Sequence, residues 1–335
     1  MIQTENGSKV SWGVISTANI GLKKVIPAIQ QGNYTSVTAI ASRDYNMAKK
    51  AAAELNIPKA YGSYEQLLAD KEIDAIYIPL PNHLHVEWTI KSLEAGKHVL
   101  CEKPISINYG EAVYLNEQVK RFPKLKVMEA FMYKFHPQWQ KIKDLIASGA
   151  IGELRNIHAL FSYYNVDPDN VRNKADIGGG GLLDIGCYCI SAARFIFEDE
   201  PLRVAGIVDY DPELKIDRLA SGVMEFKMGT ATFTCSTQLK YDQGVEIFGT
   251  EGKIKVYIPF TPMPDIKAKV LLQKGETSEE FIFDECNQYT IQGDMFSLAV
   301  LNNREVPANL SDALGNMKVI DSIFQSSREH SYIEI

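Results

Sequence analysis

Three side chains in two segments have the types and spacing needed for proton transfer at a substrate oxygen. Lys103 directly follows an apolar run typical of a strand, and Asp184 and Tyr188 follow the glycine run 178–181. Residues four apart share one face of a helix, so Asp184 and Tyr188 are expected side by side. A tyrosine can act as a general acid or base when a lysine lowers its pKa, and Asp184 could orient that lysine or a substrate hydroxyl. The structural alternatives are a surface ion pair between Lys103 and Glu102, and a core tyrosine with a satisfied hydroxyl.

A turn of small residues near the N-terminus could hold the phosphates of a dinucleotide. In the G-x-G-x-x-G frame this chain has Ser16, Ala18 and Gly21, so two glycines are replaced by small residues. Small residues let the backbone approach a pyrophosphate, and the following helix offers N–H groups and a positive dipole end. Alone the signal is weak, because such a turn is about as often plain packing as phosphate binding. The cofactor contacts predicted in this turn are Ser16, Thr17, Ala18, Asn19 and Ile20.

The end of the next predicted strand bears on which dinucleotide fits. Ser42 stands where an NAD site usually carries an acidic residue for the ribose 2′-hydroxyl, and Arg43 follows it. A hydroxyl and a guanidinium suit a 2′-phosphate, because arginine binds phosphate in a bidentate way. NADP is therefore the preferred cofactor, with NAD as the alternative. Arg43 could instead only solvate the start of a helix, and the nearby Asp44 weakens the case for a phosphate.

Further cofactor contacts are predicted where the later strands end. The prolines of the segment 79–83, PLPNH, fix an irregular loop where a nicotinamide ribose would lie. His83 and His85 do not face each other on a helix, which argues against a metal pair, and no metal site is predicted. The predicted contacts are Pro79, Leu80, Asn82, His85, Glu102 and Lys103.

The elements that must position these residues change character along the chain. Strands are expected at 9–15, 36–42, 74–80, 98–101 and 126–130, with helices between them. This alternation predicts right-handed βαβ units and a parallel sheet, which binds ligands at the carboxyl ends of its strands. Beyond about residue 131, runs of strands without intervening helices predict an antiparallel sheet. We therefore predict an α/β protein with a dinucleotide-binding domain at 1–130 and an α+β domain at 131–335.

Composition and charge are those of an ordinary folded protein. A net charge of −7 gives no global electrostatic reason to bind nucleic acid or an anionic membrane. The N-terminal residues lack the apolar segment of a signal peptide, and no stretch approaches the ~20 apolar residues that span a bilayer. The five cysteines show no C-x-x-C spacing and are expected to be reduced. A cytoplasmic protein with no nucleic-acid or membrane partner is expected.

Four segments together resemble the glucose–fructose oxidoreductase/inositol dehydrogenase (Gfo/Idh/MocA) family. They are the turn 13–21, PNHLH at 81–85, AGKHVLCEKP at 95–104 and GGGLLDIGCY at 179–188. The likeness covers nearly the whole chain. The segments MEAFMYKFHPQ and DIGCYCI, at 128–138 and 184–190, are most similar to the subgroup of dimeric dihydrodiol dehydrogenase and aldose dehydrogenases such as xylose dehydrogenase.

The resemblance implies an N-terminal Rossmann domain and a C-terminal domain on an open, mainly antiparallel sheet that commonly serves dimerisation. It also implies that Lys103 lies beside the reacting carbon and that Asp184 supports it. Many members have a histidine where this chain has Tyr188. The tyrosine form is similar to the sugar and dihydrodiol subgroup, where it is the proposed proton donor or acceptor, and it argues against an inositol dehydrogenase.

The expected function is an NAD(P)-dependent dehydrogenase or reductase that moves a hydride between the nicotinamide and a sugar-like alcohol or carbonyl carbon. Its substrate would be a polyol, sugar or related carbonyl compound, and it would form a homodimer or higher homo-oligomer. One alternative is a catalytically silent NAD(P)-sensing regulator, against which the retention of Lys103, Asp184 and Tyr188 speaks. The other is an NAD-dependent glycoside hydrolase of the same fold, which would cause no net change in nicotinamide absorbance.

Overall fold

The computed structural model describes residues 7–335. Residues 1–6, part of the segment in which no signal peptide is expected, lie outside this range. The chain divides into two compact units that are interleaved along the sequence. The first comprises Met1–Ser106, Gly110–Met132 and Asn287–Ala313, and the second comprises Ile107–Tyr109, Tyr133–Cys286 and Leu314–Ile335.

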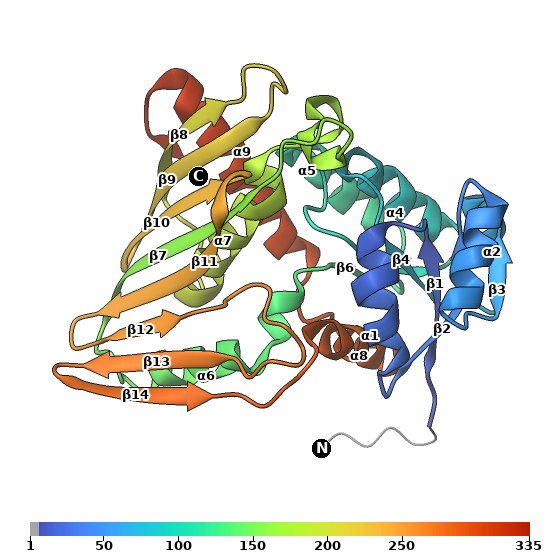
Figure 1. Ribbon diagram of the computed structural model, residues 1–335, viewed down its shortest axis with the longest axis horizontal. Helices are drawn as coiled ribbons and strands as arrows, with labels where there is room; N and C mark the ends of the chain where they lie inside the picture. The colour runs from blue at the N-terminus through green and yellow to red at the C-terminus, as the bar shows by residue number, and fades with distance from the viewer. Residues whose placement is uncertain (1–6) are drawn as a thin grey trace. The chain divides into compact units, whose positions relative to one another are not determined.

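The first unit is built on a six-stranded sheet with the order β3-β2-β1-β4-β5-β6 (Figure 1). Its strands are β1 Val10–Ile15, β2 Thr35–Ala41, β3 Lys59–Tyr61, β4 Ala75–Ile78, β5 His98–Cys101 and β6 Val127–Glu129. Every neighbouring pair is parallel, which confirms the Rossmann-type prediction. The sequence did not predict β3, because three half-buried residues at the edge of the sheet carry no periodic signal.

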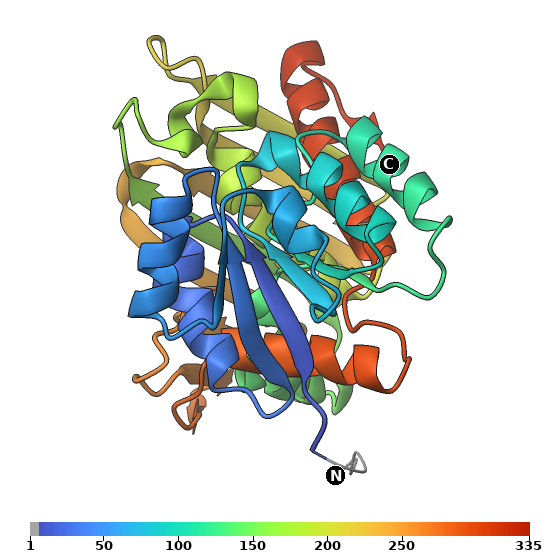
Figure 2. The same ribbon diagram turned by 90° about the vertical axis from the view of Figure 1, so that its right-hand side faces the viewer.

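Helices cover both faces of this sheet. Its helices are α1 Ile26–Gln30, α2 Tyr45–Glu54, α3 Tyr64–Leu68, α4 His85–Glu94, α5 Tyr109–Val119 and α8 Gln288–Leu301. Consecutive strand residues point to opposite faces. On one face Trp12 Nε1 donates to Ser297 Oγ of α8 at 3.2 Å, and on the other a Cβ at Gly13 would meet Leu67 of α3. Figure 2 shows α8, from late in the chain, lying across β1 and β2.

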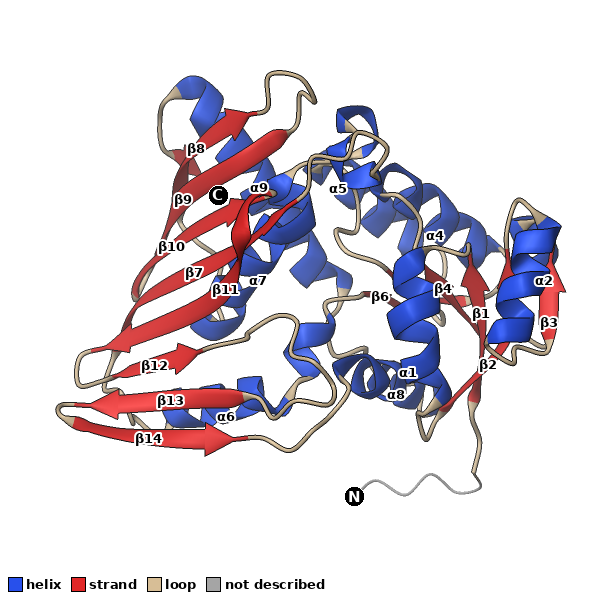
Figure 3. Ribbon diagram, in the orientation of Figure 1, coloured by secondary structure: helices blue, strands red, loops and turns tan. Residues whose placement is uncertain are grey.

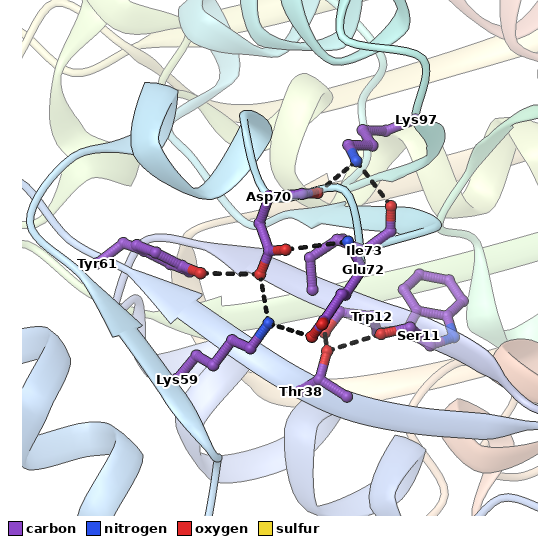
Figure 4. A network of polar contacts seen from close by, with 9 residues as sticks. All are labelled: Ser11, Trp12, Thr38, Lys59, Tyr61, Asp70, Glu72, Ile73 and Lys97. Atoms are coloured by element: carbon purple, nitrogen blue, oxygen red, sulfur yellow. Dashed lines mark hydrogen bonds and ion pairs between the residues drawn. The ribbon is translucent and has the colours of Figure 1, made fainter.

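A network of charged side chains joins β3 to the loop before β4 (Figure 4). Asp70 Oδ2 accepts hydrogen bonds from Lys59 Nζ and from the Tyr61 hydroxyl, each at 2.8 Å, and Asp70 Oδ1 accepts from the Glu72 amide at 2.9 Å. The hydrogen bond from Lys59 is the largest cause that lowers the pKa of Asp70, to about 2. Lys97 Nζ caps the same loop by donating to the carbonyl oxygen of Asp70 at 2.6 Å.

Replacing Asp70 with asparagine should lower the melting temperature at neutral pH. Because the pKa of Asp70 is below its unfolded value, its contribution is fully present above about pH 4 and is lost as the pH falls towards 2. The melting temperatures of the variant and the wild type should therefore converge in acid. Glu72→Gln is the matched control, since Glu72 shares Lys59 but its side chain is 78% exposed, and it should change little. A difference for Asp70→Asn that stays constant from neutral to acid pH would contradict this electrostatic account.

The second unit is built on a nine-stranded sheet with the order β14-β13-β12-β11-β7-β10-β9-β8-β15. Its strands are β7 Leu154–Tyr164, β8 Arg203–Tyr210, β9 Asp217–Phe226, β10 Gly229–Ser236, β11 Gln238–Gly249, β12 Lys253–Val256, β13 Lys269–Lys274, β14 Thr277–Ile282 and β15 Ile333–Glu334. Only β7 and β10 pair in parallel among these neighbours. The predicted, mainly antiparallel C-terminal sheet is therefore confirmed.

One face of this sheet carries the helices of the unit, α6 Pro137–Ala147, α7 Cys187–Phe197 and most of α9 Leu310–Glu329 (Figure 3). Ile323 of α9 packs where Gly206 and Gly222 leave room on β8 and β9. Residues on the other face alternate with these, and Ile207 there is 74% exposed. The sheet is thus covered by helices of its own unit on one side only.

The helical stretch that ends with α7 is unusually apolar. Within residues 7–335, Ala175–Phe197 is the one helical stretch whose length and composition would allow it to cross a membrane. In the structure 83% of its most apolar window is buried inside the protein, which accounts for the composition.

Candidate active site

The predicted cofactor residues of the first unit gather along one edge of its sheet. Ser16 follows β1, Ser42 follows β2, Pro79 follows β4 and Glu102 follows β5. Because the strands are parallel, all four turns lie at the carboxyl edge, where doubly wound sheets bind ligands.

The first of these turns has the backbone of a phosphate-binding turn although it lacks the usual glycines. Ser16 has a φ of 84°, in the left-handed region that glycine favours, and its hydroxyl accepts a hydrogen bond from the Ala18 amide at 3.1 Å. A helical segment begins at Asn19 and continues through a π-helical turn, Gly21–Val25, into α1. Gly21 lies close to Pro79, which a Cβ there would reach at 3.5 Å. A strained turn leading to a helix N-terminus fits a pyrophosphate.

The second turn carries Ser42 and Arg43, on which the predicted preference for NADP depends. Ser42 is buried, and its hydroxyl accepts from the Asp44 amide at 3.2 Å. Asp44 itself caps α2, accepting from the Asn46 amide at 2.8 Å, so this carboxylate is committed to the helix start. Burial raises the pKa of the Tyr64 phenol, and the guanidinium of Arg43, hydrogen-bonded to it, opposes that shift. Arg43 therefore lies beside Tyr64, and its side chain is also exposed to solvent.

His85 ties the loop after β4 to the loop after β5. It is completely buried, with Nδ1 2.7 Å from the Pro104 carbonyl oxygen and Nε2 2.8 Å from that of Leu80. Burial lowers the pKa of His85 to about 4, so at neutral pH the ring carries one proton and donates to one of the two oxygens. Both ring nitrogens of His85 contact backbone carbonyl oxygens, so neither is available for a hydrogen bond to a cofactor. The role of His85 at the predicted cofactor site is therefore indirect: it holds the two loops together.

Lys103 starts the loop that His85 holds. Glu102 Oε2 accepts from the Lys103 amide at 3.3 Å, and Glu102 Oε1 accepts from the hydroxyl of Tyr77 in β4 at 2.7 Å. Burial, reinforced by the Glu102 charge, raises the pKa of Tyr77 well above its ordinary value, so this phenol remains a donor. The Lys103–Pro104 peptide bond is cis. The backbone that carries Lys103 is thus fixed to the sheet through Glu102.

In the second unit, Tyr188 is packed by other aromatic rings. It is 5% exposed, and its ring centroid lies 5.8 Å from that of Tyr133, 5.7 Å from Phe161 and 5.4 Å from Phe260. These contacts fix the ring plane of a residue in the first turn of α7.

Asp184, four residues earlier, has two partners that the sequence did not reveal. Its Oδ2 accepts from the Tyr163 hydroxyl at 2.6 Å and from Arg172 Nε at 3.0 Å. Tyr163 is the penultimate residue of β7, and Arg172 lies in a short 3-10 turn, Val171–Asn173. The segment 165–176, rich in Asn and Asp, was the only sequence signal near them.

The glycine run before Asp184 folds over a buried acid, Asp217 of β9. The Leu182 amide donates to Asp217 Oδ2 at 2.5 Å. Gly180 has a φ of 115°, and a Cβ there would overlap Asp217 Oδ1, so both conformation and space require glycine. Burial raises the pKa of Asp217 to about 7, and the charge of Asp184 adds to the shift. Asp217 therefore anchors the N-terminus of the helix that carries Asp184 and Tyr188.

Lys103 belongs to the first unit, whereas Asp184 and Tyr188 belong to the second. Their meeting at one substrate stays a prediction. Among residues 7–335, no group of three or more His, Cys, Asp and Glu side chains is arranged to hold a metal ion.

Comparison with known proteins assigns the family. A model described as an oxidoreductase family with an NAD-binding Rossmann fold matches residues 10–131, and a Gfo/Idh/MocA C-terminal domain matches residues 139–255. D-xylose 1-dehydrogenase (NADP(+)) 2 of Haloferax volcanii is 35% identical over 326 residues, which is 97% of this chain and 99% of that protein. The chain belongs to the Gfo/Idh/MocA family.

Other members of the family are similar over the same extent. An uncharacterised oxidoreductase of Rhizobium meliloti, ORF334, is 44% identical over 329 residues, covering 96% of this chain and 98% of that protein. The solved structure of KijD10, a 3-ketoreductase from Actinomadura kijaniata in complex with NADP and TDP-benzene, matches with a TM-score of 0.89 and 30% identity, over 95% of this chain and 98% of that one. The predicted family and its aldose dehydrogenase subgroup are confirmed, and this Gfo/Idh/MocA protein is an NAD(P)-dependent dehydrogenase or reductase.

Proposed function

We propose that this protein transfers a hydride between NADP and the alcohol or carbonyl carbon of a sugar-like substrate. The observation that carries the proposal is the pair of sites that its two units supply. One is a Rossmann edge with Lys103 on a fixed loop, and the other is the glycine-led helix with Asp184 in its π-helical turn, Leu182–Gly186, and Tyr188 in the first turn of α7. Bound NADPH supplies the hydride when the substrate is reduced.

In the proposed mechanism Tyr188 gives its phenolic proton to the substrate oxygen as the carbon is reduced, and takes a proton back when the alcohol is oxidised. The Lys103 ammonium stabilises the tyrosinate or the developing alkoxide, because a neighbouring cation favours the charged form of a phenol. Asp184 holds Lys103 in place. The turns at Ser16 and Ser42 bind and orient the cofactor.

The relatives support a sugar-type substrate. One is a D-xylose dehydrogenase and another a 3-ketoreductase solved with NADP. The ketoreductase has also been solved with a lysine replaced by alanine and with a tyrosine replaced by phenylalanine. Lysine and tyrosine are also the residue types of Lys103 and Tyr188, to which we assign the proton transfer and its electrostatic support.

A steady-state assay tests the proposed function. Purified protein is mixed with NADPH and a panel of ketoses, aldoses and diketones, and the nicotinamide absorbance is followed together with the release of free sugar from glycosides. Oxidation of NADPH that depends on one carbonyl compound is the expected result. Cofactor binding without turnover would favour the sensing regulator, and sugar release without net absorbance change would favour the glycoside hydrolase.

The preference for NADP is proposed from Ser42 and Arg43. Arg43→Ala should weaken NADPH binding by roughly 10- to 100-fold, because a hydrogen bond to a charged group contributes about 1.5–3 kcal/mol. NADH binding should change little, since NADH lacks the 2′-phosphate. Fluorescence titration with both nucleotides measures the two affinities. The control is Lys49→Ala, which removes an exposed cation of the following helix, α2. Equal losses for the two nucleotides would contradict phosphate recognition by Arg43.

We also propose a cytoplasmic homodimer or higher homo-oligomer formed through the C-terminal sheet. The face of this sheet that its own helices leave uncovered exposes Ile207, and the five cysteines are free thiols, as expected in a reducing compartment. Sedimentation velocity tests the assembly. A species of at least twice 37.5 kDa is expected, and a monomer at micromolar concentration would contradict it.

A further inference from the structure

Asp184 is embedded in a cluster of ionisable groups from four elements. Tyr163 faces it from β7, Arg172 from the 3-10 turn, Asp217 from β9, and Tyr188 from its own helix. The side chain of Asp184 is only 13% exposed, whereas that of Arg172 is 46% exposed. Asp184 pairs with the Arg172 guanidinium, whereas the nearby Asp217 accepts from the Leu182 amide.

The two acids interact unfavourably. Burial is the main cause that raises the pKa of Asp217, and the charge of Asp184 raises it further. The same repulsion acts on Asp184, because like charges in a poorly solvated site disfavour each other's ionised forms. A carboxylate at this position needs a cation or strong donors to remain charged at neutral pH.

The two contacts of Asp184 differ in kind. Tyr163 is a neutral donor, because burial and then the Asp184 charge raise the pKa of its phenol far above the ordinary value. Arg172 supplies a positive charge from within the same unit, and the charge of Asp184 in turn raises the pKa of Arg172 against the opposing effect of burial. Both hydrogen bonds fall on the same oxygen, Oδ2, and hold that oxygen between β7 and the 3-10 turn.

We propose that Arg172 is a positioning residue that keeps Asp184 ionised and, together with Tyr163, correctly oriented for its part in the reaction. The link to catalysis rests on the proposed function, in which Asp184 holds Lys103. The charge relation between Arg172 and Asp184 does not depend on it, because both groups lie in the second unit.

The first experiment needs no substrate and measures thermal unfolding between about pH 5 and pH 8. In Arg172→Gln the pKa of Asp184 should rise above its unfolded value, so the stability of the variant falls as the pH increases through that range. The gap in melting temperature from the wild type should therefore widen with pH. Arg172→Lys should retain most of the wild-type profile, because it keeps the charge.

Two further variants keep the test decisive. In an Asp184→Asn background the Arg172→Gln substitution should lose its pH dependence, because the carboxyl group whose pKa is expected to shift is absent. This double variant also recovers a folded protein if Arg172→Gln alone does not fold. Arg218→Gln is the matched control, since Arg218 Nε contacts Asp209 Oδ2 at 2.7 Å in the same unit but both side chains are well exposed. A gap for Arg172→Gln that is constant with pH, or equally large in the Asp184→Asn background, would overturn the proposal.

The second experiment follows the pH profile of kcat for carbonyl reduction. In Arg172→Gln the acid limb should move up by about one to three pH units, the usual effect of losing a cation next to a carboxylate. Arg172→Lys should restore it, while the Kd for NADPH stays unchanged. An unshifted acid limb contradicts the proposal. A wild type without any turnover defeats the proposed function and leaves the unfolding experiment as the test of Arg172.

Discussion

Replacing Lys103 with methionine should lower kcat by about 10²- to 10⁴-fold while the protein still folds and binds NADPH. Methionine keeps much of the length of the side chain but removes its charge. Without the ammonium, the phenolate of Tyr188 or the alkoxide of the substrate would have to form without a neighbouring cation. The loss should appear in kcat and in kcat/KM together, because the interaction exists mainly in the transition state.

The control for this variant is Lys91→Met, which removes a partly exposed lysine of the same unit that lies over Trp88, 4.2 Å from its ring centroid. It should leave kcat unchanged. Single-turnover measurements with saturating NADPH separate the chemical step from release of product. A near-normal kcat for Lys103→Met would remove Lys103 from the mechanism.

Tyr188→Phe should also lower kcat by about 10²- to 10⁴-fold, the usual range for losing a general acid or base. Phenylalanine keeps the ring, so the contacts with Phe161 and Phe260 remain. Only the hydroxyl group is removed, which makes this the cleaner of the two active-site substitutions.

Tyr133→Phe is the matched control for Tyr188→Phe. It removes a hydroxyl from the same aromatic cluster, one that hydrogen-bonds to Ser191 Oγ at 2.8 Å. We expect it to lower the melting temperature more than kcat, because a buried hydrogen-bonding partner is left unsatisfied. Equal kcat losses for the two variants would show that the effect at Tyr188 comes from packing.

The carboxyl-edge part of the site could be predicted because it follows from local sequence. Strand–helix alternation fixes a parallel sheet, and the ends of parallel strands share an edge, so Ser16, Ser42 and Lys103 could be assigned to that edge without coordinates. The left-handed backbone at Ser16 and the committed cap at Asp44 then sharpened the case for a phosphate.

The surroundings of Asp184 could not be predicted, because they come from distant segments. Tyr163 lies 21 residues before its partner Asp184, and Asp217 lies 35 residues after its partner Leu182. Both lie on strands whose register no local sequence pattern specifies. The double contact of His85 with Leu80 and Pro104 is likewise tertiary. The sequence alone does not indicate whether the ring of a histidine in a loop motif faces inward.

The most direct test of the mechanism is a crystal structure of the protein with NADPH and a carbonyl substrate or its alcohol product. The account predicts that Lys103 Nζ and Tyr188 Oη both lie within about 3 Å of, or one water from, the reacting oxygen, with the nicotinamide next to the carbon that bears it. A complex in which either side chain points away from that oxygen would contradict it.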